Sequence, residues 1–142
     1  MANDHSLRKI GRSIGAVLAG IVAVIILSIG TDLVLHAMGI VPGLGEPVCD
    51  SLLLVATVYR TIYSIAGSYI TAWLAPDRPM NHALAGGVLG LILGIVGVIT
   101  TWNGAGMGHH WYSIALAVLA LPSAWVGGKL RITQAKQVQP AS

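Results

Sequence analysis

The sequence predicts an all-α integral membrane protein, an antiparallel four-helix bundle with both termini in the cytoplasm. Hydrophobic residues make up 55% of the 142 residues and charged residues only 9%, whereas a soluble domain carries about 25% charged residues. Three charge-free stretches, residues 13–31, 83–101 and 111–128, are each 18 or 19 residues long. This length is close to what a helix needs to cross a hydrocarbon core of about 30 Å. A fourth stretch, residues 51–75, carries a single charge, Arg60.

The basic residues predict the orientation of the bundle. All eight Lys and Arg residues except Arg60 lie before the first stretch, between the second and third, or after the fourth: Arg8, Lys9, Arg12, Arg78, Lys129, Arg131 and Lys136. Cytoplasmic loops of membrane proteins carry an excess of Lys and Arg, so both termini are expected in the cytoplasm. The net charge of +3 is explained by this topology, and nucleic acid is not expected as a partner.

Each element follows from the same pattern. Residues 1–12 are expected to form a cytoplasmic arm, residues 13–130 a transmembrane domain, and residues 131–142 a polar cytoplasmic tail. The spans are expected at about 13–38, 51–75, 82–102 and 111–130. Pro76 and Pro79 end the second span because proline cannot continue a helix. Glycines and prolines mark the loop at 39–50, and glycines mark the loop at 103–110. Because the connections are short, consecutive spans are expected to pack antiparallel.

Small residues recur at every fourth position on three of the spans. They are Gly15, Ala19 and Ala23 on the first, Gly86, Gly90 and Gly94 on the third, and Ala120, Ala124 and Gly128 on the fourth. Helices in lipid associate through close contact between small-residue faces. These ridges therefore predict helix packing, either inside one bundle or between the subunits of a homo-oligomer.

The sequence also predicts an ion pair within the membrane. Asp32 lies in the first span and Arg60 in the second, at equal distances from the turn that joins them. The two side chains should therefore lie at the same depth in an antiparallel hairpin. An unpaired charge costs about 2.5–3.5 kcal/mol at the centre of a helix in the membrane. The pair is either a clamp that fixes the hairpin or part of an ion or substrate site.

Other polar groups gather around this pair in the outer half of the predicted bundle. His36 shares the face of Asp32 on the first span, while Thr57 starts a stripe of hydroxyl and small residues on the second. Tyr59 and Tyr63 lie one turn apart beside that stripe. Together with Asp32 and Arg60, these residues are candidates for lining a polar pocket that binds a ligand or ion. They are equally consistent with hydrogen bonds that hold the helices together.

Histidines offer a weaker possibility of a metal or haem site on the outer side. His36, His109 and His110 are all expected there, and imidazole is a common ligand of transition metals and haem iron. None of them has a recognised ligand spacing, and the chain has one cysteine, which excludes a cysteine-rich zinc site. No cofactor is therefore expected, and an outer-side metal or haem protein is kept as an alternative.

Several short motifs resemble a group of uncharacterised bacterial four-span membrane proteins. The motifs are Gly30-Thr-Asp-x-x-x-His36, Tyr59-Arg60, Ala75-Pro-x-Arg-Pro-Met-x-His82, Trp111-Tyr112 and Ala124-Trp-x-Gly-Gly128. The resemblance covers roughly residues 14–130. It implies a location in the bacterial inner membrane and carries no mechanism with it.

These observations favour a protein without enzymatic activity. The chain has no soluble domain and no catalytic motif. The leading hypothesis is a membrane subunit or interaction protein, as a homo-oligomer or within a larger membrane complex, that packs through its small-residue ridges. The alternative is a small proton-coupled or small-solute transporter that uses Asp32, Arg60 and His36.

Overall fold

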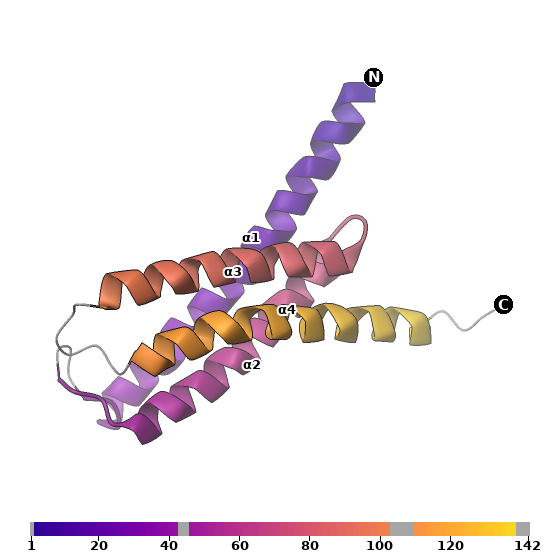
Figure 1. Cartoon of the computed structure of the whole chain (residues 1–142). Helices are drawn as coiled ribbons and strands as arrows, with labels where there is room; N and C mark the ends of the chain where they lie inside the picture. Colours follow the sequence, from indigo (N-terminus) through magenta and orange to yellow (C-terminus); the bar gives the residue numbers. More distant parts are fainter. Residues whose placement is uncertain (1, 43–45, 103–109, 139–142) are drawn as a thin grey trace.

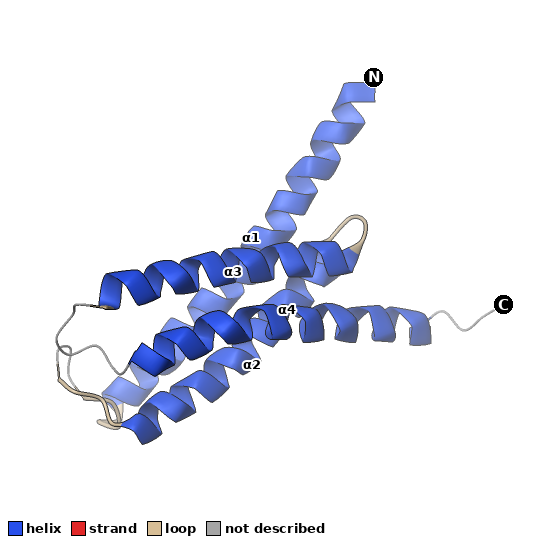
Figure 2. Ribbon diagram, in the orientation of Figure 1, coloured by secondary structure: helices blue, strands red, loops and turns tan. Residues whose placement is uncertain are grey.

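The structure is a computed structural model that describes residues 2–42, 46–102 and 110–138. These residues form four α-helices, and none of them lies in a strand (Figure 1, Figure 2). The helices are α1 (Ala2–Ala37), α2 (Asp50–Leu74), α3 (Pro79–Thr101) and α4 (His110–Val138). The predicted all-α class and the four helices are therefore confirmed.

Three of the helices are long and apolar enough to cross a membrane: α1 over Ser6–Ala37, α3 over Pro79–Thr100, and α4 over His110–Val138. Helix α2 has 25 residues but is less apolar, because Arg60 and a row of hydroxyl side chains lower its hydropathy. Length and composition alone thus support three of the four predicted spans.

Two helices extend beyond the predicted spans. Helix α1 includes the arm expected at residues 1–12, and α4 continues past residue 130 to Val138. Neither extension contains a proline, so nothing in the backbone ends the helix there. Hydroxyl groups bond to the carbonyl oxygens one turn earlier in both extensions, from Ser13 to Lys9 and from Thr133 to Lys129. The polar tail expected from residue 131 is therefore helical as far as it is described.

Helix α2 lies at the centre of the arrangement, because it packs against each of the other three helices. Helix α4 also packs along α3, and α1 also contacts α3. Among the described residues, α1 does not pack directly against α4. The first turns of α1 extend beyond the other helices (Figure 1). One side of α1 therefore has no neighbour among the residues that the structure describes.

Small side chains form the buried interior, and large apolar side chains lie on the outside. The buried apolar residues are Ala16, Leu53, Ala72, Ala83, Ala117 and Ala124, and no large side chain is fully buried among the described residues. Exposed large side chains are found on all four helices, for example Ile26, Leu54, Leu93 and Val118. This exposure agrees with the finding that three of the helices are long and apolar enough to cross a membrane.

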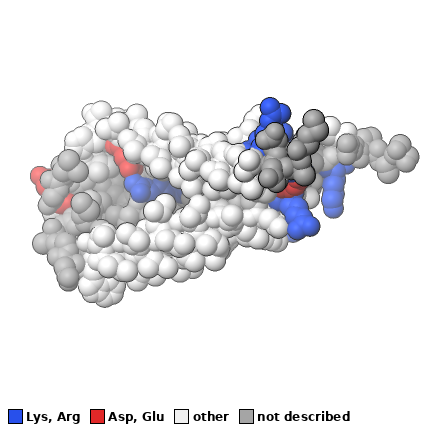
Figure 3. All heavy atoms as spheres, turned by 90° about the horizontal axis from the view of Figure 1, so that it is seen from above, with Lys and Arg blue, Asp and Glu red and all other residues white. Residues whose placement is uncertain are grey.

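Charged groups are concentrated at the ends of the molecule. Lys and Arg gather towards the end at which α4 terminates, and most of the surface seen in Figure 3 carries neither charge. At that end Lys9 of α1 forms a salt bridge of 3.3 Å with Asp77, in the turn between α2 and α3. The charge segregation predicted from the sequence is therefore present along the length of the helices.

Candidate functional site

Asp32 of α1 and Arg60 of α2 form the ion pair predicted from their positions. The Arg60 Nη2 donates to the Asp32 Oδ2 at 2.5 Å, and the two side chains are 33% and 40% exposed. Asp32 and Arg60 lie side by side because they are equally far in sequence from the turn, and α1 and α2 run in opposite directions. The pair links the two helices in the half of the molecule opposite the basic end.

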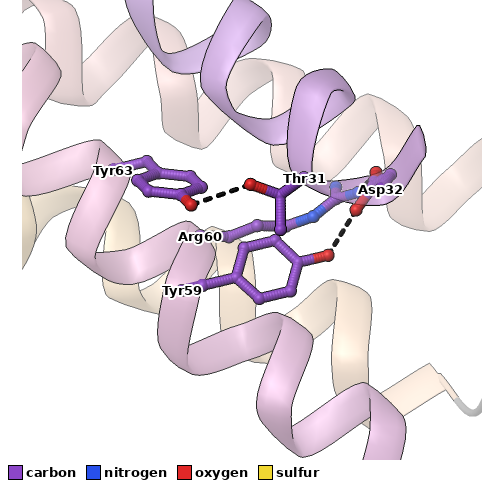
Figure 4. Close-up of polar contacts among 5 residues, drawn as sticks. All are labelled: Thr31, Asp32, Tyr59, Arg60 and Tyr63. Atoms are coloured by element: carbon purple, nitrogen blue, oxygen red, sulfur yellow. Dashed lines mark hydrogen bonds and ion pairs between the residues drawn. The ribbon is translucent and has the colours of Figure 1, made fainter. Parts of the chain in front are cut away.

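Two tyrosines complete the contacts between α1 and α2 (Figure 4). The Tyr59 hydroxyl donates to the Asp32 Oδ1, so both oxygens of this carboxylate accept hydrogen bonds. The Tyr63 hydroxyl is 2.8 Å from the Thr31 Oγ1. The two tyrosine rings lie with their centroids 5.7 Å apart. Asp32 is thus held from two directions, which fixes its carboxylate within the hairpin.

Arg60 has binding capacity that Asp32 does not use. Its Nε is buried and has no hydrogen-bond partner among the described residues. The Tyr112 ring of α4 lies 6.0 Å from the Arg60 Cζ, which is at the outer limit of a cation–π contact. Guanidinium presents five N–H donors in a planar fork that suits carboxylate and phosphate oxygens. Arg60 is therefore the group in the site best suited to bind an acceptor from a ligand.

A cavity of about 420 Å³ opens beside the ion pair. Its polar lining comes from Asp32, His36, Tyr59, Arg60 and Tyr112. The remaining walls are mostly aliphatic, with Ile29, Leu33, Leu35, Ile40, Val41, Pro42, Val48, Leu52, Leu53, Val55 and Ala56. This volume lies in the range of small-molecule sites, and apolar walls with a few convergent polar groups are typical of such sites. The cavity could hold a small molecule with one polar end.

Two candidate residues from the sequence do not line this cavity. Thr57 donates its hydroxyl to the carbonyl oxygen of Leu53 at 2.8 Å, and the next hydroxyls of the stripe, on Thr61 and Ser64, do the same one turn further on. Tyr63 is engaged with Thr31 instead. The hydroxyl stripe on α2 thus bonds largely to its own helix, and the polar pocket is smaller than the sequence predicts.

The histidines do not come together. His36 lines the cavity, whereas the His110 ring stacks on Trp102 with centroids 4.5 Å apart. His109 lies outside the described residues. Within the described ranges, no three His, Cys, Asp or Glu side chains are placed so that they could hold a metal ion. The geometry therefore gives no support to a metal or haem site.

Glycines and alanines of α3 and α4 pack against each other, and Gly90 with Ala120 joins the two predicted ridges. A Cβ on Gly94 would lie 3.0 Å from the Ala117 Cβ, one on Gly90 would lie 3.6 Å from the Ala120 Cβ, and one on Gly128 would lie 3.0 Å from the Ala83 Cβ. Gly87, which is not on the predicted ridge, makes the closest approach, 2.5 Å from the Ala124 Cβ. Gly86 faces α2 instead, because a Cβ on Gly86 would lie 4.0 Å from the Thr71 Oγ1.

Helix α1 differs from the prediction. Gly15 is exposed, with no heavy atom within 4 Å of an added Cβ, while Ala19 and Ala23 are half-buried. The close contact with α2 is made by Gly20 instead, where an added Cβ would lie 2.5 Å from the Gly67 carbonyl oxygen. The predicted ridge on α1 is thus displaced from the face that packs inside the chain.

The sequence reasoning missed part of the cavity. Its apolar walls include Ile40, Val41, Pro42 and Val48 from the loop between α1 and α2, and no polar pattern marks these residues. In the sequence, Tyr112 is marked only by the motif Trp111-Tyr112. Its position opposite Arg60 depends on how α4 packs on α2, which the sequence of neither helix reveals alone.

The chain has no significant match among models of protein families, curated proteins or solved structures.

Proposed function

We propose that the four helices cross a membrane as an antiparallel bundle with both termini in the cytoplasm. The exposed apolar side chains on every helix support insertion. The first turns of α1, the turn at residues 75–78 and the last turns of α4 carry the basic residues, and all three belong on the cytoplasmic side under the positive-inside rule. The resemblance to bacterial four-span proteins suggests the inner membrane.

Helix α2 crosses the membrane in this proposal despite Arg60. Its central position surrounds it with the other three helices, so its polar side faces protein rather than lipid. The ion pair with Asp32 offsets much of the cost of a membrane-embedded charge. Arg60 thus fits a spanning helix that is shielded by its neighbours.

Cys49 provides a direct test of this orientation. It is exposed at the start of α2, at the end of the molecule opposite the basic residues. A membrane-impermeant maleimide is expected to label it in spheroplasts but not in sealed inverted membrane vesicles. A Cys49→Ser/Gln137→Cys variant moves the thiol to the last turn of α4 and should reverse the result. Labelling of Cys49 in inverted vesicles only would refute the orientation.

Within the membrane, the protein acts as a non-enzymatic subunit or interaction protein. The observation that carries this proposal is the free face of α1. Three of its glycines, Gly11, Gly15 and Gly30, have no heavy atom within 4 Å of an added Cβ. At 100° per residue they share one side of the helix with Ala19 and Ala23, within about 120°. Small residues on a lipid-facing side permit close contact with another helix, which here is a second copy or a partner subunit.

The test is the assembly state in native membrane particles. Extraction with a lipid-preserving copolymer, followed by mass determination, should show a homo-oligomer or a complex with a partner protein. Gly15→Leu should shift the preparation towards the single chain by blocking close approach. Gly97→Leu is the matched control, because Gly97 of α3 also has no heavy atom within 4 Å of an added Cβ. A strictly monomeric wild-type protein without a partner would refute the proposal.

A second candidate function is a carrier for a small solute. The 420 Å³ cavity beside the ion pair favours it, because Arg60, Asp32 and His36 line the same space. In proteoliposomes this function predicts solute-dependent or proton-coupled flux that Asp32→Asn abolishes. Unchanged flux in that variant would remove Asp32 from the mechanism.

A further inference from the structure

A second cavity, of about 470 Å³, lies at the basic end of the molecule. It is formed between the turn that joins α2 to α3 and the last turns of α4. Three cationic side chains line it: Arg78 from the turn, and Arg131 and Lys136 from α4. None of the interactions in the candidate functional site involves them. The cavity brings together three positive charges that are far apart in the sequence.

The extension of α4 is held in the position that forms this cavity. The Tyr69 hydroxyl of α2 donates to the Gln134 Oε1 at 2.6 Å, on the part of α4 that follows the predicted span. Arg131 and Ile132 are adjacent, Ala135 follows one turn later, and all three lie on the side of α4 that lines the cavity. The cavity is thus a consequence of the continued helix, which would be lost if residues 131–138 were an unstructured tail.

The electrostatics of the cavity favour an anion. Asp77 is the carboxylate in its lining, and it is paired with Lys9 of α1. Arg78 has a left-handed backbone conformation, with φ 46° and ψ 66°, and directly precedes the first residue of α3, Pro79. The positive end of the α3 dipole therefore points towards the same region. The Nζ of nearby Lys129 lies 4.4 Å from the centroid of the Trp125 ring, in a cation–π contact outside the cavity.

The position of the cavity favours a phosphate group at the surface of a bilayer. Trp73, which also lines it, is 59% exposed at the end of α2, and tryptophan is enriched at the level of lipid headgroups. Arg131 follows directly on the apolar part of α4. Basic pockets between helices on the cytoplasmic side are suited to anionic lipid headgroups.

We propose that Arg78, Arg131 and Lys136 form a binding site for a phosphate anion, presented by the headgroup of an anionic phospholipid. This inference rests on the membrane insertion proposed above, but not on assembly through α1. Arg131 and Arg78 contact the phosphate oxygens from opposite sides of the cavity, and Lys136 adds charge at its rim. Apolar side chains in the lining, such as Ile132, contact the first carbon atoms of the lipid acyl chains.

The test measures phosphatidylglycerol binding to the purified protein by native mass spectrometry in detergent, with phosphatidylcholine as the zwitterionic comparison. Arg131→Gln is expected to weaken phosphatidylglycerol binding about fivefold, and Arg78→Gln/Arg131→Gln about 25-fold. Arg8→Gln/Lys129→Gln removes the same net charge outside the cavity and should have little effect. Arg131→Lys keeps the charge and should retain most of the binding, which separates loss of the site from loss of the fold.

Competition with millimolar inorganic phosphate distinguishes the two sources of the anion. No competition supports a lipid headgroup as the ligand. Displacement of the lipid supports the anion site and identifies soluble phosphate as a second occupant. Equal losses in the cavity variant and in the Arg8→Gln/Lys129→Gln control would overturn the proposal, because binding would then follow net charge alone. Insertion is measured separately by co-flotation with vesicles, so failure to insert is not confused with loss of this site.

Discussion

The α1–α2 and α3–α4 interfaces hold their helices together by different means. Between α3 and α4 the contact is made by glycine and alanine, with Gly87 against Ala124 and Gly94 against Ala117. Helices α1 and α2 approach closely at Gly20 and Gly67. Further along, the two helices are joined by the Asp32–Arg60 ion pair and the bonds of two tyrosines. The first interface depends on shape and the second on charge.

This difference determines where the molecule has room for a ligand. Beside the small side chains of α3 and α4 the space is limited to a cavity of about 170 Å³, whose lining includes Gly87, Gly90 and Ala120. Large polar side chains join α1 and α2 near the loop that connects them, and the 420 Å³ cavity lies beside these side chains. Charged groups inside a membrane are costly and often mark functional pathways. The charged interface thus borders a cavity with polar groups in its lining, whereas the small-residue interface is a packing contact.

The largest effect is expected at the charged interface. Arg60→Met leaves the Asp32 carboxylate without its cation, and should lower the free energy of unfolding by about 3 kcal/mol. The measurement is denaturant unfolding in mixed micelles. Asp32→Asn/Arg60→Met removes both charges and should cost clearly less than the single change. Equal losses in the two variants would show that the ion pair does not couple α1 to α2.

A smaller loss is expected at the small-residue interface. Gly87→Ala places a methyl group 2.5 Å from the Ala124 Cβ, which is closer than two carbon atoms can pack. Overpacking of this kind costs about 2 kcal/mol. The same unfolding assay measures it. Gly97→Ala, where an added Cβ meets no heavy atom within 4 Å, should cause no loss. Adding Ala124→Gly to Gly87→Ala should restore most of the stability, and failure to do so would argue against direct contact.

The two tyrosines provide a finer comparison within the charged interface. Tyr59→Phe removes a hydrogen bond to the Asp32 carboxylate, which is worth about 1.5 kcal/mol or more. Tyr63→Phe removes a bond to the neutral Thr31 hydroxyl and should cost about 1 kcal/mol or less. Thermal unfolding of both variants in the same detergent measures the difference. A larger loss from Tyr63→Phe would mean that charge does not dominate this interface.

The smallest effect concerns the reactivity of Cys49, next to the loop that lines the cavity. The pKa of this thiol is below its ordinary value because of hydrogen bonds from the Ser51 side chain and the Leu52 backbone. More thiolate is therefore present at a given pH than in a free thiol. Ser51→Ala should raise the pKa and shift the rate profile of maleimide labelling to higher pH. An unchanged profile would show that Ser51 does not influence the thiol.

Much of the fold could be predicted because it follows from local patterns. Charge-free stretches and prolines give the helices, and equal distance from a turn gives the depth of Asp32 and Arg60. The helix ends were harder to predict, because the end of an apolar stretch is not the end of a helix. Nothing in residues 131–138 stops α4, and the bond from Tyr69 to Gln134 holds it to α2.

The packing face of α1 could not be predicted for a different reason. Gly15, Ala16, Ala19 and Gly20 place small residues on two adjacent sides of the helix, and both sides satisfy the same spacing rule. Which side meets α2 depends on the partner surface, where Gly67 gives the space. The aliphatic walls of the cavity escape prediction similarly, because aliphatic residues are common throughout a membrane protein.

The length of α1 has a mechanical consequence. The helix is continuous over 36 residues, or about 54 Å at 1.5 Å per residue. Its tightest contact, Gly20 against Gly67, acts as a fulcrum, with an arm of about 27 Å towards the N-terminus and one of about 18 Å towards Asp32. A sideways displacement of the first turns of α1 is therefore transmitted, reduced by about a third and in the opposite direction, to the carboxylate that faces Arg60. The exposed salt bridge between Lys9 and Asp77 restrains the N-terminal part of α1 against this movement.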